Sequence, residues 1–338
     1  MRILVLGGSG LTGPHFVRRL IELGHEVTVF HRGASKSSES GARGIAGDLQ
    51  QLEGHQAAFR RVDPQVVVHT RALNETDARR FLRVFSGLAE RSVVISSGDV
   101  YRSFGWVRRT EPGAPDTPPC EPLTEDSPLR LQATDEAESY DKIAVERVIR
   151  SDPGLPATVL RYAAVYGPRD GHRLFRWARR MWDGRPVIPM EESYARWLFS
   201  HGYAEDVAEA VVLAVLDGAA AGRVYNVAPG PCPSMEDRVR AIGAVAGWEG
   251  HVVRLAADAA PGLARPEFDF RFPIHLDSTR IRRELGYRET VPEEEGLRRT
   301  LDWYRENPPP EPGPDDPSYA TEDAALAARH RSARGEKS

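Results

Sequence analysis

The sequence predicts an α/β protein with a doubly wound parallel sheet, helices on both faces and a smaller C-terminal lobe. Short runs of valine, isoleucine and leucine alternate with helical patterns through the first half of the chain, which is typical of β-α-β units. These runs are continuously apolar, as strands covered on both faces require. A glycine-rich turn directly follows the first run.

The expected elements follow from the same pattern. Five strands are expected in the first half: Ile3–Leu6, Val27–Phe30, Val66–His69, Val93–Ser96 and Thr158–Leu160. Three helices are expected between them: Phe16–Leu23, Asp77–Leu88 and Asp141–Ile149. The segment Trp106–Asp126 is rich in Pro, Gly, Asp and Glu, which favours a loop.

The chain is expected to divide into three parts. Residues 1–168, with some returning segments, form the sheet domain, and residues 169–305 form mainly the smaller lobe. Helices with short turns should dominate this lobe, with one strand at Val224–Val227. Residues 306–338 are proline-rich and then Ala/Arg-rich, which predicts a partly disordered tail.

Composition narrows the class of protein. Hydrophobic residues make up 41% and charged residues 28% of the 338 residues, as in ordinary soluble proteins. The net charge of −4 argues against a nucleic-acid or anionic-membrane partner. The apolar runs are too short for a signal peptide or a membrane span. Cys120 and Cys232 fit no metal spacing, so we expect free thiols, no metal site and a cytoplasmic location.

The glycine-rich turn is the first candidate site. It reads Gly7-Gly8-Ser9-Gly10-Leu11-Thr12-Gly13, and it lies between an expected strand and an expected helix. Gly7 permits the tight turn, Gly10 lets a pyrophosphate approach the backbone, and Gly13 lets the helix pack close to the strand. No Gly-Lys-Ser/Thr follows, which excludes a P-loop. We therefore expect a dinucleotide to bind at Gly7, Ser9, Gly10, Leu11, Thr12 and Gly13.

The end of the second strand predicts which dinucleotide binds. An acidic residue there would hydrogen-bond the ribose 2′-hydroxyl of NAD, whereas a cation accommodates the 2′-phosphate of NADP. His31, Arg32 and Lys36 occupy this region, and no acidic residue does. NADP(H) is therefore the preferred cofactor, and NAD(H) is the alternative.

Several further motifs follow the glycine turn along the chain. They are Asp48-Leu49, the Val66–His69 strand, Ser96–Tyr101, Lys142 with Glu146, Tyr166–Pro168, Glu205–Ala208, Tyr225–Val227 and Glu284–Tyr287. Together with the glycine turn, over about residues 1–305, they resemble the extended short-chain dehydrogenase/reductase family, the NAD-dependent epimerases/dehydratases. The resemblance implies a Rossmann-type domain, a C-terminal substrate lobe and chemistry beside the nicotinamide.

The same resemblance implies roles for particular residues. Asp48 would contact the adenine with Leu49 beside it, and Ser97 would hydrogen-bond the substrate oxygen. Lys142 would bind the nicotinamide ribose and lower the pKa of a catalytic tyrosine, because a neighbouring ammonium stabilises a phenolate. We also count Thr70 and Tyr162 among the cofactor-binding residues. Family members commonly dimerise through two helices, here Asp77–Leu88 and Asp141–Ile149, so a homodimer is expected.

The sequence departs from the family at the catalytic tyrosine. The family pattern is Tyr-x-x-x-Lys, but Glu138 stands four residues before Lys142. On a helix Glu138 would share a face with Lys142, whereas Tyr140 would point roughly 160° away. Glu138 is therefore the candidate base. In a second hypothesis Tyr140 or Tyr101 supplies the phenol from another position, and in a third the site binds a nucleotide without turnover. The non-catalytic interpretation of Glu138 is an exposed ion pair with Lys142.

Asp99 adds a second carboxylate. The family's sugar-nucleotide 4,6-dehydratases read Thr-Asp-Glu-Val-Tyr in this stretch, and Asp99 occupies the place of the glutamate base. Gly98 stands where the preceding acid would be, so the acid pair is incomplete. Asp99 is either catalytic or a cap of the following turn.

The sequence narrows the substrate only to a broad chemical class. Phe199 stands where the family usually has an arginine, so specificity for nucleotide sugars is not supported, although Arg196 could substitute. The sequence predicts an NADP(H)-dependent reductase, epimerase or dehydratase that acts on a carbonyl- or hydroxyl-bearing small metabolite, sugar derivatives included. The alternative is a catalytically silent nucleotide-binding or redox-sensing protein.

Overall fold

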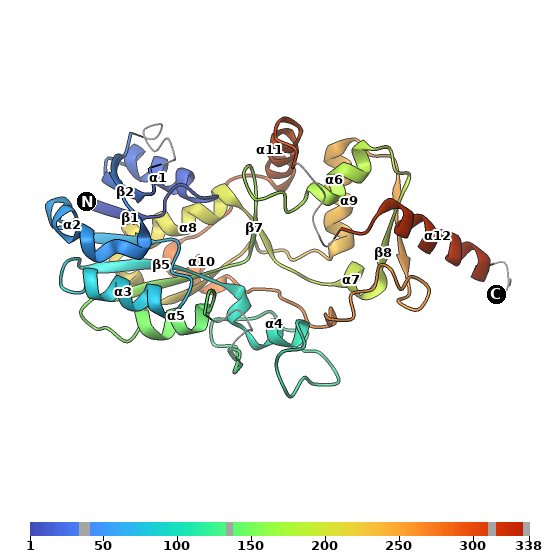
Figure 1. Ribbon diagram of the computed structural model, residues 1–338, viewed down its shortest axis with the longest axis horizontal. Helices are drawn as coiled ribbons and strands as arrows, with labels where there is room; N and C mark the ends of the chain where they lie inside the picture. Colours follow the sequence, from blue (N-terminus) through green and yellow to red (C-terminus); the bar gives the residue numbers. More distant parts are fainter. Residues whose placement is uncertain (34–40, 133–137, 310–315, 334–338) are drawn as a thin grey trace.

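A computed structural model describes residues 1–33, 41–132, 138–309 and 316–333. Its central element is a parallel sheet of seven strands in the order β10-β6-β5-β4-β1-β2-β3 (Figure 1). The strands are β1 (Arg2–Leu6), β2 (Glu26–His31), β3 (Arg43–Ala46), β4 (Val66–His69), β5 (Arg91–Ser97), β6 (Ala157–Tyr162) and β10 (Val224–Val227). The predicted fold class is confirmed, and all six predicted strands are present. The strand Val224–Val227 was expected in the smaller lobe, but it pairs with β6 and lies at the edge of the central sheet.

The two faces of the sheet follow from the alternation of side chains along each strand. In β1, Ile3 and Val5 pack under α1 (Gly13–Glu22), α8 (Ala204–Leu216) and α10 (Thr279–Leu285). Leu4 and Leu6 face η2 (Leu49–His55), α2 (Gln56–Val62), α3 (Glu75–Phe85) and α5 (Lys142–Ile149). Helices on both faces explain why the strands are continuously apolar.

The topology fixes where a ligand can bind. β1 pairs with β2 on one side and with β4 on the other, and Leu6 lies opposite both Phe30 and His69. The chain order therefore reverses at β1, and the carboxyl ends of these strands meet at one edge of the sheet. In open α/β sheets the crevice at such a switch point is the usual ligand site.

A second hydrophobic core lies in the C-terminal half (right side of Figure 1). Its helices are α6 (Phe175–Trp182), α7 (Glu192–Arg196), α9 (Met235–Ala246) and α11 (Glu293–Glu306). Two small parallel sheets pair β8 (Val187–Glu191) with β11 (His251–Leu255) and β7 (Ala164–Tyr166) with β9 (His201–Tyr203). These four strands were not expected.

The remaining short elements are η3 (Gly98–Val100), α4 (Arg102–Val107) and η4 (Gly218–Ala220). The chain from residue 108 to 126 contains no helix or strand among its described residues, in agreement with the expected loop.

The C-terminal segment differs from the expected tail. Residues Tyr319–Ala333 form a helix, α12. Glu322 of α12 and Arg180 of α6 form a buried ion pair at 2.6 Å, and Ala325 packs in a small core beside β11. Alanine favours helix formation, and this packing holds the helix to the lobe. Its last turns extend away from the body of the molecule (Figure 1).

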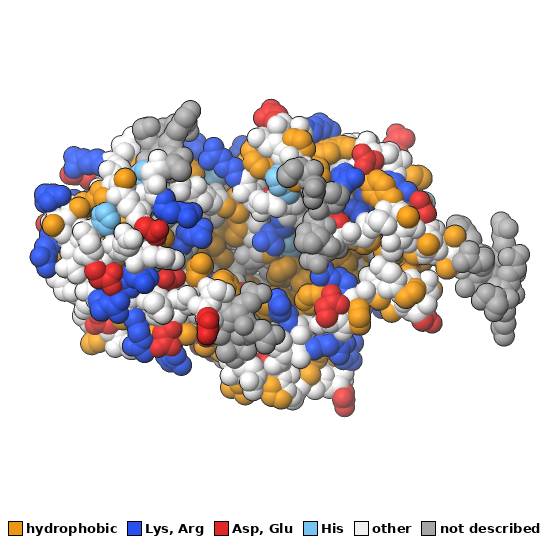
Figure 2. Space-filling view, viewed as in Figure 1, with side chains coloured by type: hydrophobic (Ala, Val, Ile, Leu, Met, Phe, Trp, Pro, Cys, Tyr) orange, Lys and Arg blue, Asp and Glu red, His pale blue; other side chains and the backbone are white. Residues whose placement is uncertain are grey.

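The surface carries charges of both signs. Figure 2 shows basic and acidic side chains interspersed over one face, with a recess lined by hydrophobic side chains near its middle. Within the described residues, none of the helices is both long and apolar enough to cross a membrane.

Candidate active site

The glycine turn is built as a phosphate cradle. Gly7 has a φ of +84°, and a Cβ added there would lie 2.7 Å from Oγ1 of Thr70. The Thr70 hydroxyl donates to the carbonyl oxygens of Leu6 and Gly7 at 3.0 and 2.9 Å, so it holds the end of β1 in place. A Cβ on Gly13 would lie 2.2 Å from the carbonyl oxygen of Gly8, which fixes the close approach of α1 to the turn.

Gly10 has the opposite environment. A Cβ added to Gly10 would meet none of the described atoms within 4 Å, so the backbone here borders open space. Thr12 is the N-cap residue of α1, and within this described turn its side chain accepts no hydrogen bond from the helix. The N-terminal amides of α1 therefore remain available for an anion, and the turn fits a pyrophosphate group.

A cavity of about 570 Å³ lies against this turn. Nearly all of the predicted cofactor residues line it: Gly7, Ser9, Gly10, Leu11, Thr12, Gly13, His31, Arg32, Asp48, Leu49, Thr70 and Tyr162. Lys142 contacts its wall, because its ammonium donates to the carbonyl oxygen of the lining residue Ile95 at 3.1 Å. Lys36 lies outside the described residues. The size and donor set of the cavity suit a dinucleotide.

The rim of the cavity contains the residues that predict cofactor choice. Arg32 follows β2, and Nδ1 of His31 accepts the backbone N–H of Gly33 at 3.0 Å. Asp48 follows β3, and its carboxylate accepts the backbone N–H of Gln50 at 2.9 Å as the cap of η2. β3 therefore brings Asp48 and Leu49 beside the end of β2.

At the carboxyl end of β5, Tyr140, Asp99 and Lys142 come together. The Tyr140 hydroxyl donates to Oδ2 of Asp99 at 2.6 Å. The Lys142 ammonium lies 5.8 Å from the centre of the Tyr140 ring and donates to the carbonyl oxygen of Ala72 at 2.6 Å. Ser97 caps the turn after β5 by accepting the Asp99 N–H at 3.3 Å, so Ser97 and not Asp99 is the cap.

The premise that placed Glu138 on a helical face with Lys142 is wrong. α5 begins at Lys142, and Asp141 is its N-cap, accepting the N–H groups of Ile143 and Ala144 at 3.0 and 3.1 Å. Asp141 is extended, with φ of −145° and ψ of 93°, so helical spacing does not apply before it. Glu138 lies in an exposed turn, whereas Tyr140 reaches the pair Asp99 and Lys142.

Burial sets the electrostatics of this group. Burial raises the pKa of Asp99, although Tyr140, Arg130 and Lys142 oppose the shift, and Oδ1 of Asp99 has no hydrogen-bond partner among the described residues. Burial and the Asp99 charge raise the pKa of the Tyr140 phenol well above its usual range. Burial lowers the pKa of Lys142 to about 8, against the opposing attraction of nearby acids. The phenol is therefore protonated at neutral pH, and its pKa is not lowered as the resemblance had implied, because burial and Asp99 outweigh any nearby cation.

Arg130 lies directly behind Asp99. Its guanidinium Nε donates to the Asp99 carbonyl oxygen at 2.6 Å, and its side chain is buried. The Arg130 charge favours the ionised forms of both Asp99 and Tyr140. Sequence reasoning missed Arg130, because nothing in its spacing pointed to Asp99.

Tyr101 serves the fold and does not join this group. Its hydroxyl donates to Oδ1 of Asn226 at 2.6 Å and accepts from the Arg161 guanidinium at 3.0 Å. Arg161 also pairs with the buried Glu146 at 2.7 Å. Burial raises the pKa of the Tyr101 phenol to about 12, and its proton is committed to this network.

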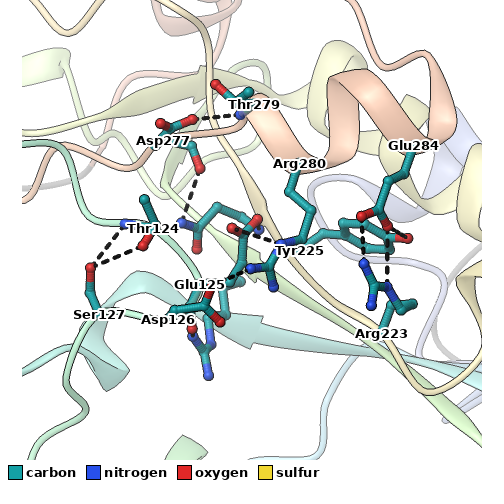
Figure 3. Close-up of polar contacts among 12 residues, drawn as sticks. Thr124, Glu125, Asp126, Ser127, Arg223, Tyr225, Asp277, Thr279, Arg280 and Glu284 are labelled. Carbon is teal, nitrogen blue, oxygen red and sulfur yellow. Dashed lines mark hydrogen bonds and ion pairs between the residues drawn. The ribbon is translucent and has the colours of Figure 1, made fainter.

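The same network ties the end of the long loop 108–126 to the sheet (Figure 3). The backbone N–H of Asn226 donates to the Glu125 carboxylate at 2.8 Å, and its side-chain amide donates to the Asp277 carbonyl oxygen at 3.1 Å. Arg280 of α10 pairs with Glu125 at 3.5 Å and with Asp126 at 2.5 Å. The end of the long loop is thereby fixed beside β10.

The described residues contain neither a candidate metal site nor a disulfide. Among the described residues, no group of three or more His, Cys, Asp or Glu side chains could hold a metal ion. Cys120 and Cys232 are both free thiols.

The fold and this site together define a class of protein. Its features are a parallel sheet covered by helices, a cavity that suits a dinucleotide, and a tyrosine close to a lysine beside that cavity. The model of the NAD dependent epimerase/dehydratase family matches residues 3–228. The chain belongs to that family, and the predicted resemblance to extended short-chain dehydrogenases/reductases is confirmed.

Three similar proteins illustrate the range of the family. The chain is 28% identical over 332 residues to a dTDP-glucose 4,6-dehydratase of Streptomyces niveus, covering 91% of this chain and 94% of that protein. It is 30% identical over 252 residues to a 3-diazoavenalumate denitrifying reductase of a Streptomyces species, covering 70% and 79%. The UDP-glucose 4-epimerase of Thermus thermophilus, solved in complex with NAD, has a TM-score of 0.67 at 26% identity, covering 91% and 100%.

Proposed function

We propose that this protein is an NAD(P)-dependent enzyme that transfers hydride at an oxygen-bearing carbon of a small metabolite, with Tyr140 as the proton donor. The observation that carries the proposal is the convergence of Tyr140, Asp99 and Lys142 beside the dinucleotide cavity. A tyrosine two residues before the lysine takes the place of the family's Tyr-x-x-x-Lys pair, because α5 begins late.

The roles follow from the contacts. A bound nicotinamide supplies or accepts the hydride. Tyr140 gives its phenolic proton to the substrate oxygen in the reductive direction, and Ser97, on the same strand end, hydrogen-bonds that oxygen. Lys142 and Arg130 stabilise the negative charge that then develops on the phenol. The hydrogen that Tyr140 donates to Asp99 at 2.6 Å is the one transferred, so this hydrogen bond is exchanged for one to the substrate oxygen before the transfer.

The sharpest test of these roles compares two neighbouring residues. Glu138→Gln is the matched control for Tyr140→Phe, because Glu138 lies on an exposed turn only two residues away. We expect Tyr140→Phe to lose activity and Glu138→Gln to keep it, in assays of NAD(P)H oxidation or NAD(P)⁺ reduction. Full activity in Tyr140→Phe with loss in Glu138→Gln would restore the carboxylate hypothesis.

We propose NADP(H) as the preferred cofactor. Arg32 at the end of β2 lines the cavity and can pair with a 2′-phosphate, although the Thermus epimerase was solved with NAD. Calorimetry with NADPH and NADH should show tighter binding of NADPH, and Arg32→Glu should reverse the order. Equal binding of both by wild-type protein would contradict this preference, and tighter binding of NADH would favour NAD(H).

The substrate class is proposed from the relatives. Two of the three proteins described above carry sugar-nucleotide substrates in their names, and the third is a reductase of a diazo compound. Sugar nucleotides are therefore the first class to test, followed by free sugars and ketones. Gly98 in place of an acid next to Asp99 favours hydride transfer or epimerisation over dehydration.

Cofactor binding without turnover of any of these classes, and without isomerisation detected by NMR, would favour the silent nucleotide-binding alternative.

We also propose a cytoplasmic homodimer. α3 and α5 lie side by side, as the family's dimer helices do, but their outer surface is charged, with Arg79 and Arg147 both paired to Glu75. Such an interface should weaken with salt. Sedimentation at low and high ionic strength tests the dimer, and cell fractionation tests the location.

A further inference from the structure

A second cavity, of about 380 Å³, lies apart from the cofactor cavity and shares none of its described lining residues. It is bounded by β9, the start of α9, the loop 229–233 and the chain from 287 to 293 that leads into α11. Its volume is in the range of small-molecule sites.

Arg238 of α9 is the one cationic side chain among the described residues that line this cavity. Its side chain is 1% exposed, and its closest acidic atom is Oε1 of Glu293 at 3.4 Å. The Glu293 side chain is itself 53% exposed. The Arg238 Nε has no hydrogen-bond partner among the described residues.

Two other buried arginines, Arg161 and Arg180, are paired much more closely with buried acids. Arg161 and Glu146 are both 3% exposed and lie 2.7 Å apart, and Arg180 and Glu322 are both 2% exposed and lie 2.6 Å apart. Arg91 and Arg130 instead donate to backbone carbonyl oxygens, at 2.9 Å to Ala214 and at 2.6 Å to Asp99. Burying a guanidinium without such a partner costs several kcal/mol. Arg238 has only the long contact to the half-exposed Glu293 among these described partners, and a bound anion would supply a closer one.

The other polar groups of the cavity are already satisfied or neutral. Asp206 accepts hydrogen bonds from the backbone N–H groups of Thr290 and Val291 at 2.7 and 3.1 Å. Glu289 pairs with Arg282 outside the cavity lining. Nδ1 of His201 lies 2.7 Å from the Phe199 carbonyl oxygen, and burial lowers the pKa of the ring well below its usual value, so it is uncharged.

The rest of the wall is apolar or aromatic. Pro229, Pro231 and Pro233 line one part of it, and Tyr287 lines another. The hydroxyl of Tyr287 is buried and has no hydrogen-bond partner among the described residues, so it is a second group that a ligand would satisfy.

We propose that this cavity binds a small organic anion, with its carboxylate or phosphate group on Arg238 and its apolar part against the three prolines and Tyr287. The site adds to the proposed function and does not depend on it, because it needs neither the cofactor nor Tyr140. Glu293 competes with the ligand for the guanidinium, since it is the acid closest to Arg238.

Calorimetry and thermal unfolding of the full chain test the site, with benzoate and inorganic phosphate as separate probes. We expect saturable binding of at least one probe, and an apparent Kd raised about tenfold or more by Arg238→Gln. Arg240→Gln is the matched control, because Arg240 lies on the same helix, is exposed and pairs with Glu236. Glu293→Gln should bind more tightly than wild type.

A measurement without ligand separates the proposal from a structural role. If Arg238 is kept for an anion, Arg238→Met should unfold at the same temperature as wild type or higher, because a poorly paired buried charge is removed. NADPH affinity should not change in this variant. Binding of neither probe, equal binding by Arg238→Gln, or a marked loss of thermal stability in Arg238→Met would overturn the proposal.

Discussion

Replacing Tyr140 with phenylalanine removes one oxygen atom and tests the core of the proposed site. The lost hydrogen bond joins a phenol to the buried Asp99 carboxylate at 2.6 Å. A hydrogen bond to a charged group contributes about 1.5–3 kcal/mol to stability, so the variant should lose about that much free energy of unfolding.

The catalytic effect should exceed the effect on stability. A positioned proton donor contributes about 10²–10⁴-fold to a rate, which corresponds to about 3–5 kcal/mol in the barrier. The cofactor cavity keeps all its described lining residues in this variant, so NADPH affinity should stay within about twofold. The predicted signature is a low kcat with nearly unchanged cofactor binding.

A double-mutant cycle checks the structural part without a substrate. Urea unfolding of Tyr140→Phe, Asp99→Ala and the double variant should give a coupling energy of about 1.5–3 kcal/mol. A coupling energy near zero would show that the two groups do not interact in solution. The proton-donor assignment would then lose its geometric basis.

Three further predictions follow from features described above. Gly13→Ala should destabilise the protein by about 1–3 kcal/mol, because its Cβ would meet the Gly8 carbonyl oxygen at 2.2 Å. Gly10→Ala should instead fold normally and weaken NADPH binding in calorimetry, because its Cβ would enter open space beside the turn. Arg161→Met should cost about 3–5 kcal/mol in urea unfolding, since it leaves Glu146 buried and unpaired, and adding Glu146→Gln should recover part of the loss. The pKa of Lys142 is about 8 in the folded protein and 10.5 in a model peptide, so the unfolded chain binds more protons between these values. Stability relative to Lys142→Met should therefore rise by up to about 2 kcal/mol from pH 8 to pH 10, and a flat difference would refute the lowered pKa.

The sheet was predictable because each strand carries its own signal. The valine-rich runs Val66–His69 and Val93–Ser96 are long enough to be recognised alone, and the glycine turn marks the edge where they end. β3 was missed, because Arg43-Gly44-Ile45-Ala46 has no such run and depends on pairing with β2. Tertiary pairing decides such strands, and local sequence does not encode it.

Predicting which side chain lies beside Lys142 required knowing where α5 begins. Spacing alone placed Glu138 beside Lys142, but this argument used helical geometry for residues that precede the helix. Asp141, a favourable N-cap residue directly before Lys142, was the signal that could have placed the helix start correctly. The Arg238 cavity had no sequence signal, since the weak pairing of a buried arginine is visible only in three dimensions.

The attachment of α12 to the C-terminal lobe has a practical consequence. Arg180 lies inside the lobe, and the carboxylate that neutralises it, Glu322, comes from a segment that could be mistaken for a dispensable extension. A shortened protein that stops at residue 306 would leave the Arg180 guanidinium without its counter-charge. Trimming the chain to its family motifs should therefore lower the stability of the C-terminal lobe.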